Sequence, residues 1–324
     1  MSRPHPWMPV SPCGPRCVAP ADAVPTVVRM RRLLAVGALL LAGALLVAVL
    51  PALGPGRHER MLRAWYKALL RALRIQLQVT GGDRFADPAV GILVVSNHTS
   101  WLDLVALGTV QPLRMVAKRE VGRWPIIGPL ARRLGTIFVD RERLSALPGM
   151  VAAVARALAD GAAVGAFPEG TTWCGLACGR FRTAVFQAAV DTAAPVRPVA
   201  LRYRWAGGGP TTVASFVGST SLWEGVVRVA GVQGLMIEVH LLPLLHDTSA
   251  TRHTLATRAE IAVGSSTDAT IRQLRRDDPA GVTPSGSTTT TNTRPCPPNN
   301  PLRGWSNTIV VDSMANLDRV GSDG

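Results

Sequence analysis

Lysine is nearly absent from this sequence of 324 residues. Two lysines, Lys67 and Lys118, stand beside 33 arginines, and with 21 acidic residues they leave a formal net charge of +14. Heavy use of arginine, alanine, glycine and proline is typical of a GC-rich coding bias, so part of the basic charge is compositional. The basic surface that remains fits either a nucleic acid or an anionic membrane.

Aromatic residues are also scarce, at 5% of the chain. The sequence contains no zinc-finger, recognition-helix or RNA-binding-sheet signature, so we expect no nucleic-acid partner and favour a membrane surface. Charged residues are few as well, at 17%, whereas hydrophobic residues make up 47%. This composition excludes a mostly disordered chain, and the length allows one large domain or two small ones.

Cysteine is infrequent and occurs in an odd number. The five cysteines are Cys13, Cys17, Cys174, Cys178 and Cys296. An odd count with C-x3-C spacings predicts neither a disulfide framework nor a four-ligand zinc site. The histidines at 98, 240 and 246 show no ligand spacing either, so we expect reduced thiols, no metal and no cofactor.

The N-terminal region contains one long apolar run. Residues 1–29 lack periodicity and are expected to be a disordered or untranslated leader, because Met30-Arg31-Arg32 would make a natural start. Residues 33–53 carry no charge and are long enough to span about 30 Å as a helix. A cleaved signal peptide is the alternative, but the run is long for a signal core and no good cleavage site follows it. We therefore assign residues 30–56 to a membrane anchor helix.

The segment after the anchor, HERMLRAWYKALLRALRIQLQV, is basic and amphipathic. Its basic residues recur every three or four positions and share one helical face, with leucines and a tryptophan beside them. Such a helix suits anionic lipid headgroups and equally well a protein core with a solvated basic face. These arginines also favour a cell-membrane protein whose later residues face the cytoplasm.

Strand-like and helix-like stretches alternate through the rest of the chain. The expected strands are 91–96, 113–117, 136–140, 162–167, 195–203 and 235–243. The expected helices are 102–110, 123–134, 145–160, 179–193 and 251–275. This order predicts an α/β domain over residues 57–275, with a largely parallel central sheet flanked by helices and an N-terminal membrane-associated helix. Residues 276–324 are of low complexity and are expected to form a flexible tail.

Polar residues crowd the end of the first expected strand, in the stretch VSNHTSWLD. His98 is a usable base near neutral pH, and the carboxylate of Asp103 could fix its tautomer. The pair would be the His–Asp half of a catalytic triad, but no G-x-S-x-G nucleophile accompanies it. The simplest catalytic hypothesis is that the nucleophile belongs to the substrate. A helix cap with a buried histidine beside it is the alternative.

Two further polar clusters follow later strands. In FPEGTT, Glu169 and Thr171 supply an acceptor and a donor, and Gly170 permits a close backbone approach; an ordinary turn is the alternative. In GTIFVDR, Arg141 leaves a strand end, where it could bind a phosphate or form a surface ion pair with a neighbouring acid. Lys118 lies at another expected strand end.

Together these elements resemble the glycerolipid acyltransferase family, the 1-acylglycerol-3-phosphate acyltransferases and their relatives. NHTSWLD resembles the N-H-x-x-x-x-D block of that family, and GTIFVDR, FPEGTT and APVRPV resemble its second, third and fourth blocks. Four blocks in the right order are far more specific than any one of them, and the resemblance covers about residues 60–245.

The resemblance implies acyl transfer from acyl-CoA or acyl carrier protein to a lysophospholipid hydroxyl, with membrane lipids as partners. The leading acceptor is 1-acylglycerol-3-phosphate, which would give phosphatidic acid. His98 would be the general base and Asp103 its orienting partner. The attacking group would be the acceptor's own hydroxyl, so no acyl-enzyme is expected.

The resemblance also implies the acceptor site. Arg141 would bind the acceptor's phosphate with Lys118 nearby, while Glu169, Gly170 and Thr171 would shape the site.

One departure affects the acceptor. The third block of the family usually ends in arginine, and this chain has Thr172 there, so Arg180 or Arg182 could substitute. Another acceptor, such as a lyso-ornithine lipid, is the alternative. Two alternative functions also remain: a thioester hydrolase and a non-catalytic relative that binds the membrane surface.

Overall fold

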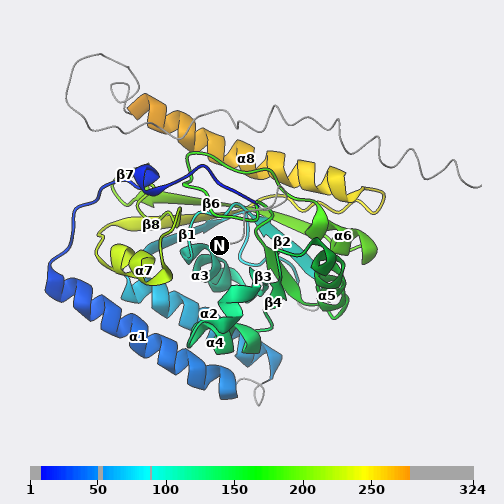
Figure 1. The fold of residues 1–324 in the computed structure, drawn as a ribbon, viewed down its shortest axis with the longest axis horizontal. Coiled ribbons are helices and arrows are strands. Elements are labelled where there is room, and N and C mark those ends of the chain that lie inside the picture. Colours follow the sequence, from blue (N-terminus) through cyan, green and yellow to red (C-terminus); the bar gives the residue numbers. More distant parts are fainter. Residues whose placement is uncertain (1–8, 50–53, 88–89, 278–324) are drawn as a thin grey trace, which may run out of the picture.

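The computed structural model describes residues 9–49, 54–87 and 90–277, which are built on one central sheet (Figure 1). Its strand order is β1-β8-β6-β2-β5-β3-β4, with β7 paired to β6. The strands are β1 (Gln76–Thr80), β2 (Ile92–Ser96), β3 (Arg114–Lys118), β4 (Ile137–Val139), β5 (Ala163–Ala166), β6 (Val196–Trp205), β7 (Gly208–Pro210) and β8 (Leu235–Leu241). Strands β2 to β6 run parallel, whereas β8 is antiparallel to β6 and β1 is parallel to β8. The expected α/β class with a largely parallel sheet is confirmed.

The middle of the sheet is buried on both faces. Every residue of β2 is buried, which explains why its sequence, ILVVS, is a continuous apolar run rather than an alternating one. Ile92 and Val94 join the core on one face, and Leu93 and Val95 join the core on the other.

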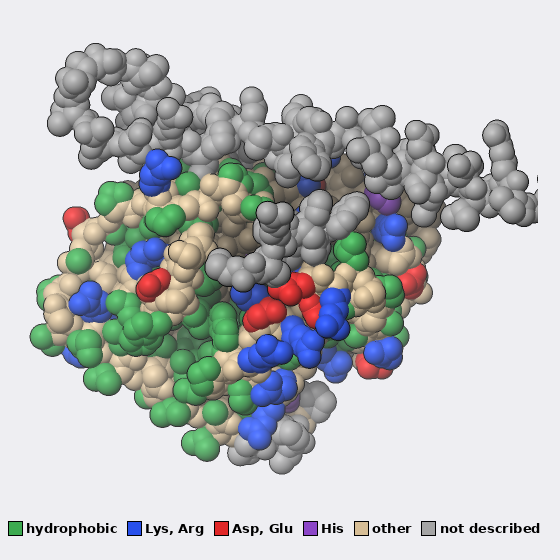
Figure 2. All heavy atoms as spheres, in the orientation of Figure 1, with side chains coloured by type: hydrophobic (Ala, Val, Ile, Leu, Met, Phe, Trp, Pro, Cys, Tyr) green, Lys and Arg blue, Asp and Glu red, His purple; other side chains and the backbone are tan. Residues whose placement is uncertain are grey.

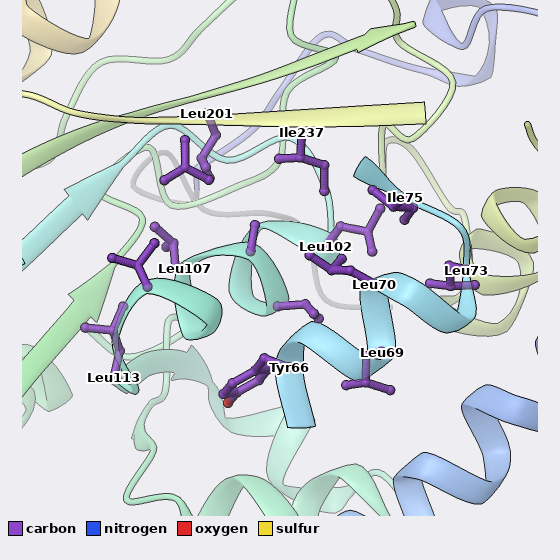
Figure 3. Packing of buried hydrophobic residues seen from close by; sticks show 14 of the residues in the cluster. Tyr66, Leu69, Leu70, Leu73, Ile75, Leu102, Leu107, Leu113, Leu201 and Ile237 are labelled. Carbon is purple, nitrogen blue, oxygen red and sulfur yellow. The ribbon is translucent and has the colours of Figure 1, made fainter. Parts of the chain in front are cut away.

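Helices cover both faces (Figure 1). On one side lie α5 (Leu147–Ala159), α6 (Ala184–Asp191) and α8 (Arg252–Asp277). On the other lie α1 (Thr26–Val49), α2 (Pro55–Ala72), α3 (Leu102–Val110), α4 (Ile127–Arg133) and α7 (Leu222–Ala230). Figure 3 shows how α2 meets α3: Leu70 of α2 points toward Leu102 at the start of α3, beneath Leu201 and Ile237 of the sheet.

The apolar run forms α1, but the helix begins earlier than expected. Among the described residues, one helix is long and apolar enough to cross a membrane, Thr26–Val47, with a mean hydropathy of 1.9. It packs lengthwise on the domain, because the Trp65 indole N–H donates to the Leu39 carbonyl at 2.7 Å and the buried Arg32 donates to the carbonyls of Ala230 and Val232.

The expectation of a disordered leader over residues 1–29 is wrong for residues 9–29. Residues 9–25, which we call the strap, lie against the domain and lead into α1. The Ala19 N–H donates to Thr212 Oγ1 at 2.8 Å, and the Val24 N–H donates to the Gly231 carbonyl at 2.8 Å. An extended segment held by backbone hydrogen bonds has no helical or strand periodicity to detect, which is why the sequence pattern did not indicate it. Residues 1–8 lie outside the described residues. So does the expected tail over 276–324, except for residues 276 and 277, which end α8.

Three elements were not expected from the sequence. The residues of β1 were expected to belong to the amphipathic helix. Helix α2 ends at Ala72, however, and Arg74 adopts a left-handed φ of 59°, after which the chain turns into β1. Strand β7 is only three residues long. Helix α7 begins at a capping box, in which Ser221 and Glu224 bond each other's backbone N–H groups. The S-x-x-E spacing is the sequence signature of such a helix start.

Candidate active site

The fold brings the predicted site residues to one edge of the sheet. Strands β2, β5, β3 and β4 are neighbours in that order and run parallel, so their carboxyl ends lie side by side. His98 follows β2, Glu169 follows β5, Lys118 ends β3 and Arg141 follows β4. This edge is where functional groups of open parallel sheets gather.

His98 and Asp103 form a hydrogen-bonded pair. The distance from His98 Nδ1 to Asp103 Oδ2 is 2.8 Å, and the Asp103 side chain is fully buried while that of His98 is 23% exposed. Because Asp103 accepts the bond, Nδ1 carries the proton and the lone pair is on Nε2. The imidazole is therefore arranged to accept a proton at Nε2.

Asp103 is held by four donors. Besides His98, its Oδ2 accepts the backbone N–H groups of Thr99 and Ser100 at 2.7 and 2.8 Å, and its Oδ1 accepts the hydroxyl of Tyr203 at 2.5 Å. The N-cap of α3 is Trp101, which makes no side-chain cap hydrogen bond, so the polar residues of this stretch converge on Asp103 rather than on a helix cap. Burial and the neighbouring Asp103 raise the pKa of the Tyr203 hydroxyl well above its usual value, so the hydroxyl stays protonated and donates.

Tyr203 was missed in the sequence. A tyrosine inside an apolar strand is typical of a core residue, and its only distinguishing signal is that the chain has two tyrosines, Tyr66 and Tyr203. Asn97 was likewise not expected to have a separate role. Its side-chain amide donates to the Leu201 carbonyl at 3.0 Å and accepts the Leu201 N–H at 2.8 Å, which ties the end of β2 to β6.

The FPEGTT loop after β5 clamps the backbone and ring of His98. Glu169 Oε2 accepts the His98 N–H at 2.7 Å, and the His98 carbonyl accepts the Trp173 N–H at 2.7 Å. The Phe167 ring stacks on the imidazole with centroids 4.0 Å apart and an interplanar angle of 6°. The ring of His98 is thus fixed between Asp103 and Phe167.

Glu169 acts on the site through the backbone. The residue is 4% exposed, and its second oxygen, Oε1, accepts the Gly179 N–H at 2.8 Å. Burial raises the pKa of the Glu169 carboxyl to about 8, although the N–H groups of Gly179 and His98 oppose this shift. With both oxygens engaged by the backbone, Glu169 shapes the site by positioning His98 and the loop rather than by offering a contact to a ligand.

Arg141 lies against the same loop. Its guanidinium donates to the Gly170 carbonyl, while its neighbour Asp140 pairs with Arg119 and Arg143 instead. Burial lowers the pKa of Arg141, Glu120 raises it and Arg182 lowers it further, which places two guanidinium groups close together. An arginine remains charged despite such shifts and keeps four further N–H donors, so this corner suits an anion.

The remaining predicted residues are Gly170, Thr171 and Lys118. Gly170 has a φ of 75°, and a Cβ there would lie 2.8 Å from Pro9 and 3.6 Å from the Arg182 side chain. Thr171 is half-buried in this loop. Lys118 is exposed at the end of β3, with its ammonium 5.7 Å from the centre of the Trp124 ring.

The departure at Thr172 has a structural counterpart. The Thr172 hydroxyl donates to the Phe216 carbonyl, so this side chain ties the loop to the segment that precedes α7. Arg182 lies ten residues after Thr172. Its backbone N–H donates to the Pro168 carbonyl at 3.0 Å, and its side chain supplies a cation beside Gly170.

Comparison with known proteins identifies the family. The family model described as Acyltransferase matches residues 76–202. The 1-acyl-sn-glycerol-3-phosphate acyltransferase of Neisseria gonorrhoeae is 37% identical over 188 residues, which are 57% of this chain and 71% of the relative. The chain belongs to the acyltransferase family. A lyso-ornithine lipid O-acyltransferase of Pseudomonas aeruginosa is 32% identical over 210 residues, 64% of this chain and 78% of that one.

A solved structure shares the fold of this acyltransferase. The 1-acyl-sn-glycerophosphate acyltransferase PlsC of Thermotoga maritima matches with a TM-score of 0.57 at 18% identity, over 75% of this chain and 94% of that one. The family, the fold class and the enzyme class expected from the sequence are confirmed. The roles of the individual site residues stay predictions.

The raised pKa of Glu169 predicts a pH-dependent stability. In the unfolded chain this carboxyl ionises near pH 4.5, whereas in the folded chain it holds its proton to about pH 8. The raised pKa therefore contributes to the free energy of unfolding, on the order of a few kcal/mol. This contribution is fully present below pH 4.5 and is lost as the pH rises through 8. Glu169→Gln keeps the shape and does not titrate, so Tm of the wild type should fall relative to the variant between about pH 5 and 8. Thermal melts of both proteins across this range test it, and a difference that moves the other way contradicts it.

Proposed function

We propose that this enzyme transfers an acyl group from acyl-CoA or acyl carrier protein to the free hydroxyl of a lysophospholipid, with 1-acylglycerol-3-phosphate as the leading acceptor. The observation that carries the proposal is the His98–Asp103 pair at the sheet edge, in which the His98 side chain is 23% exposed and hydrogen-bonded through Nδ1, beside a cationic corner. Names of relatives in the same family agree with a lipid acceptor.

The geometry supports a direct transfer. Nε2 of His98 takes the proton of the acceptor hydroxyl while the oxygen attacks the thioester carbonyl, and Asp103 stabilises the imidazolium that forms. The tetrahedral intermediate collapses as the carbon–sulfur bond breaks, and the imidazolium returns its proton to the leaving thiolate. The products are the acylated lipid and a free thiol.

The cationic corner supports an acceptor that carries a phosphate. Arg141 and Arg182 both lie next to Gly170, and Lys118 ends the strand next to β4. A phosphate held there by guanidinium groups would place the acceptor along the edge that also carries His98. Arg182 thus takes the part that the family usually gives to the position of Thr172.

A lyso-ornithine lipid is the second candidate acceptor, because relatives with that name match this chain over comparable lengths. Such a lipid has no phosphate. Activity against the two acceptors therefore distinguishes them directly.

The enzyme's N-terminal helix supports a place on a membrane surface. Large apolar residues on one face of α1, at 27, 30, 34, 41 and 45, are 48–72% exposed, whereas Arg32, Val36 and Val47 on the opposite face are buried. Figure 2 shows hydrophobic side chains gathered at the lower left, where α1 runs in Figure 1, and a band of lysine and arginine beside them. A helix docked lengthwise with one apolar face outward suits insertion into one leaflet, and the basic charge favours the anionic cytoplasmic side.

Replacing the proposed base tests the reaction. His98→Ala should reduce acyl transfer about 10²- to 10⁴-fold, the usual contribution of a general base. The assay follows diacyl lipid and free fatty acid from acyl-CoA plus lysophosphatidate, with His246→Ala, an exposed histidine elsewhere, as the control. Undiminished transfer by His98→Ala, with an unchanged Tm, refutes the mechanism. Release of fatty acid without diacyl product by the wild type indicates a hydrolase, and no turnover of any lyso-acceptor indicates a non-catalytic binder.

Removing the cationic contact tests the acceptor. Arg141→Ala should lower kcat/KM for lysophosphatidate about 10- to 100-fold, chiefly through KM, because a hydrogen bond from a charged group is worth about 1.5–3 kcal/mol. Arg143→Ala is the matched control, since that arginine is 74% exposed and two residues away. An equal loss with lyso-ornithine lipid would show that the variant damages the loop rather than a phosphate contact.

Charges on the outer face of α1 test the membrane surface. Leu34→Glu combined with Leu41→Glu should abolish co-flotation with vesicles of mixed neutral and anionic phospholipid. Ile261→Glu on α8 is the control, because Ile261 is 62% exposed on the other side of the sheet. Flotation of the double variant at the level of the control contradicts the proposed orientation of α1.

A further inference from the structure

Two cysteine pairs from distant parts of the sequence meet near the active site. Cys13 and Cys17 belong to the strap, and Cys174 and Cys178 belong to the loop that follows FPEGTT. The sulfur atoms of Cys13, Cys17 and Cys174 all lie within 4.8 Å of one another. Each pair has the C-x3-C spacing, which falls within the range that structural zinc sites use.

The grouping fits a metal better than a disulfide. A disulfide joins two sulfurs at about 2.05 Å and leaves a third nearby thiol unexplained. Thiolates bound tetrahedrally to zinc at about 2.3 Å lie about 3.8 Å from one another, so small side-chain rotations would bring these three into place. We propose that Cys13, Cys17 and Cys174, with Cys178 as the fourth ligand, bind one zinc ion that fastens the strap to the active-site loop.

The surroundings suit thiolate ligands. Cys13 and Cys174 are 5% and 0% exposed and pack with Trp173 and Val217 in an apolar cluster of their own. The Cys174 N–H lies 3.4 Å from Cys13 Sγ and donates to it. Backbone N–H groups that point at sulfur stabilise a metal-bound thiolate, and an apolar shell limits access of water to the metal.

Cys178 is not among the three sulfurs that lie within 4.8 Å of one another, so binding as the fourth ligand requires its exposed side chain to turn toward them. Cys178 lies four residues beyond Cys174, at the end of a glycine-containing turn. A four-thiolate set favours zinc among the common divalent ions, because zinc accepts tetrahedral sulfur ligands and needs no redox partner. The expectation of no metal came from the odd cysteine count, the C-x3-C spacings and the lack of histidine ligand spacing. Two points change it: the odd cysteine, Cys296, lies outside the described residues, and C-x3-C is within the zinc range.

The site would position catalytic groups without touching substrate. Trp173, next to Cys174, donates its N–H to the His98 carbonyl, and Gly179, next to Cys178, donates its N–H to Glu169. The ion would therefore hold both ends of the loop segment that clamps His98. It would also keep Pro9 of the strap against Gly170.

The test is metal content of the full chain, purified in detergent without a polyhistidine tag. Elemental analysis should give about one zinc ion per chain for the wild type. Cys17→Ser and Cys174→Ser should fall to background, and Cys296→Ser, the matched control, should keep the wild-type content. Cys17 is half-buried, so its variant remains informative if the variant of the fully buried Cys174 does not fold. Cys178→Ser should lose zinc to a competing chelator faster than the wild type.

Two further readouts separate the site from adventitious binding. Reconstitution with Co²⁺ should give thiolate-to-cobalt charge-transfer bands that Cys17→Ser lacks, and removal of zinc should speed proteolytic cleavage within residues 9–25. Absence of zinc, or equal zinc in Cys17→Ser and the wild type, overturns the proposal. A Cys13–Cys174 disulfide found by intact-mass analysis without reductant overturns it in favour of a redox link. None of these readouts depends on acyl transfer.

Discussion

The buried carboxylate of Asp103 is the constraint on which the rest of the site depends. A charge that is fully removed from water must be compensated by hydrogen bonds, and Asp103 obtains them from three elements. The start of α3 supplies the N–H groups of Thr99 and Ser100, β6 supplies the Tyr203 hydroxyl, and the end of β2 supplies His98. His98, the proposed base, is therefore oriented by the same interaction that fixes how β2, α3 and β6 meet.

A second buried carboxylate lies on the other side of the base. Glu169 accepts the His98 N–H, and the charge of Asp103 contributes to the raised pKa of Glu169. The two acids differ in their partners: Asp103 has a donor from an ionisable ring, whereas Glu169 has only backbone N–H groups. Burial raises the pKa of Glu169 despite its two backbone N–H partners, so Glu169 holds the loop as a protonated carboxyl, and Asp103 is the acid that contacts the imidazole.

The sequence predicted what depends on local pattern and on strand order. The apolar run at 91–96 indicated a strand, and the N-H-x-x-x-x-D spacing indicated the His98–Asp103 contact, because both residues belong to one strand–helix turn. Parallel strands then bring Glu169, Lys118 and Arg141 to the same edge. Local patterns do not predict contacts between distant segments. Tyr203 is 100 residues from Asp103, and Glu169 accepts the backbone N–H of His98 rather than contacting a ligand. The strap escaped prediction because backbone hydrogen bonds leave no pattern in side-chain types.

The strap connects the proposed membrane-facing helix α1 with the loop that holds the proposed base. It runs from Pro9, against Gly170, past the cysteine cluster and Thr212 to Gly231, and continues directly into α1. Helix α1 is held in turn to the connection between α7 and β8, because Arg32 donates to the carbonyls of Ala230 and Val232. An acceptor whose acyl chain stays in the leaflet can present its hydroxyl only at a fixed height above it. Because the strap joins α1 to the loop that clamps His98, one continuous segment would set both the depth of α1 in the leaflet and the height of the proposed base above it.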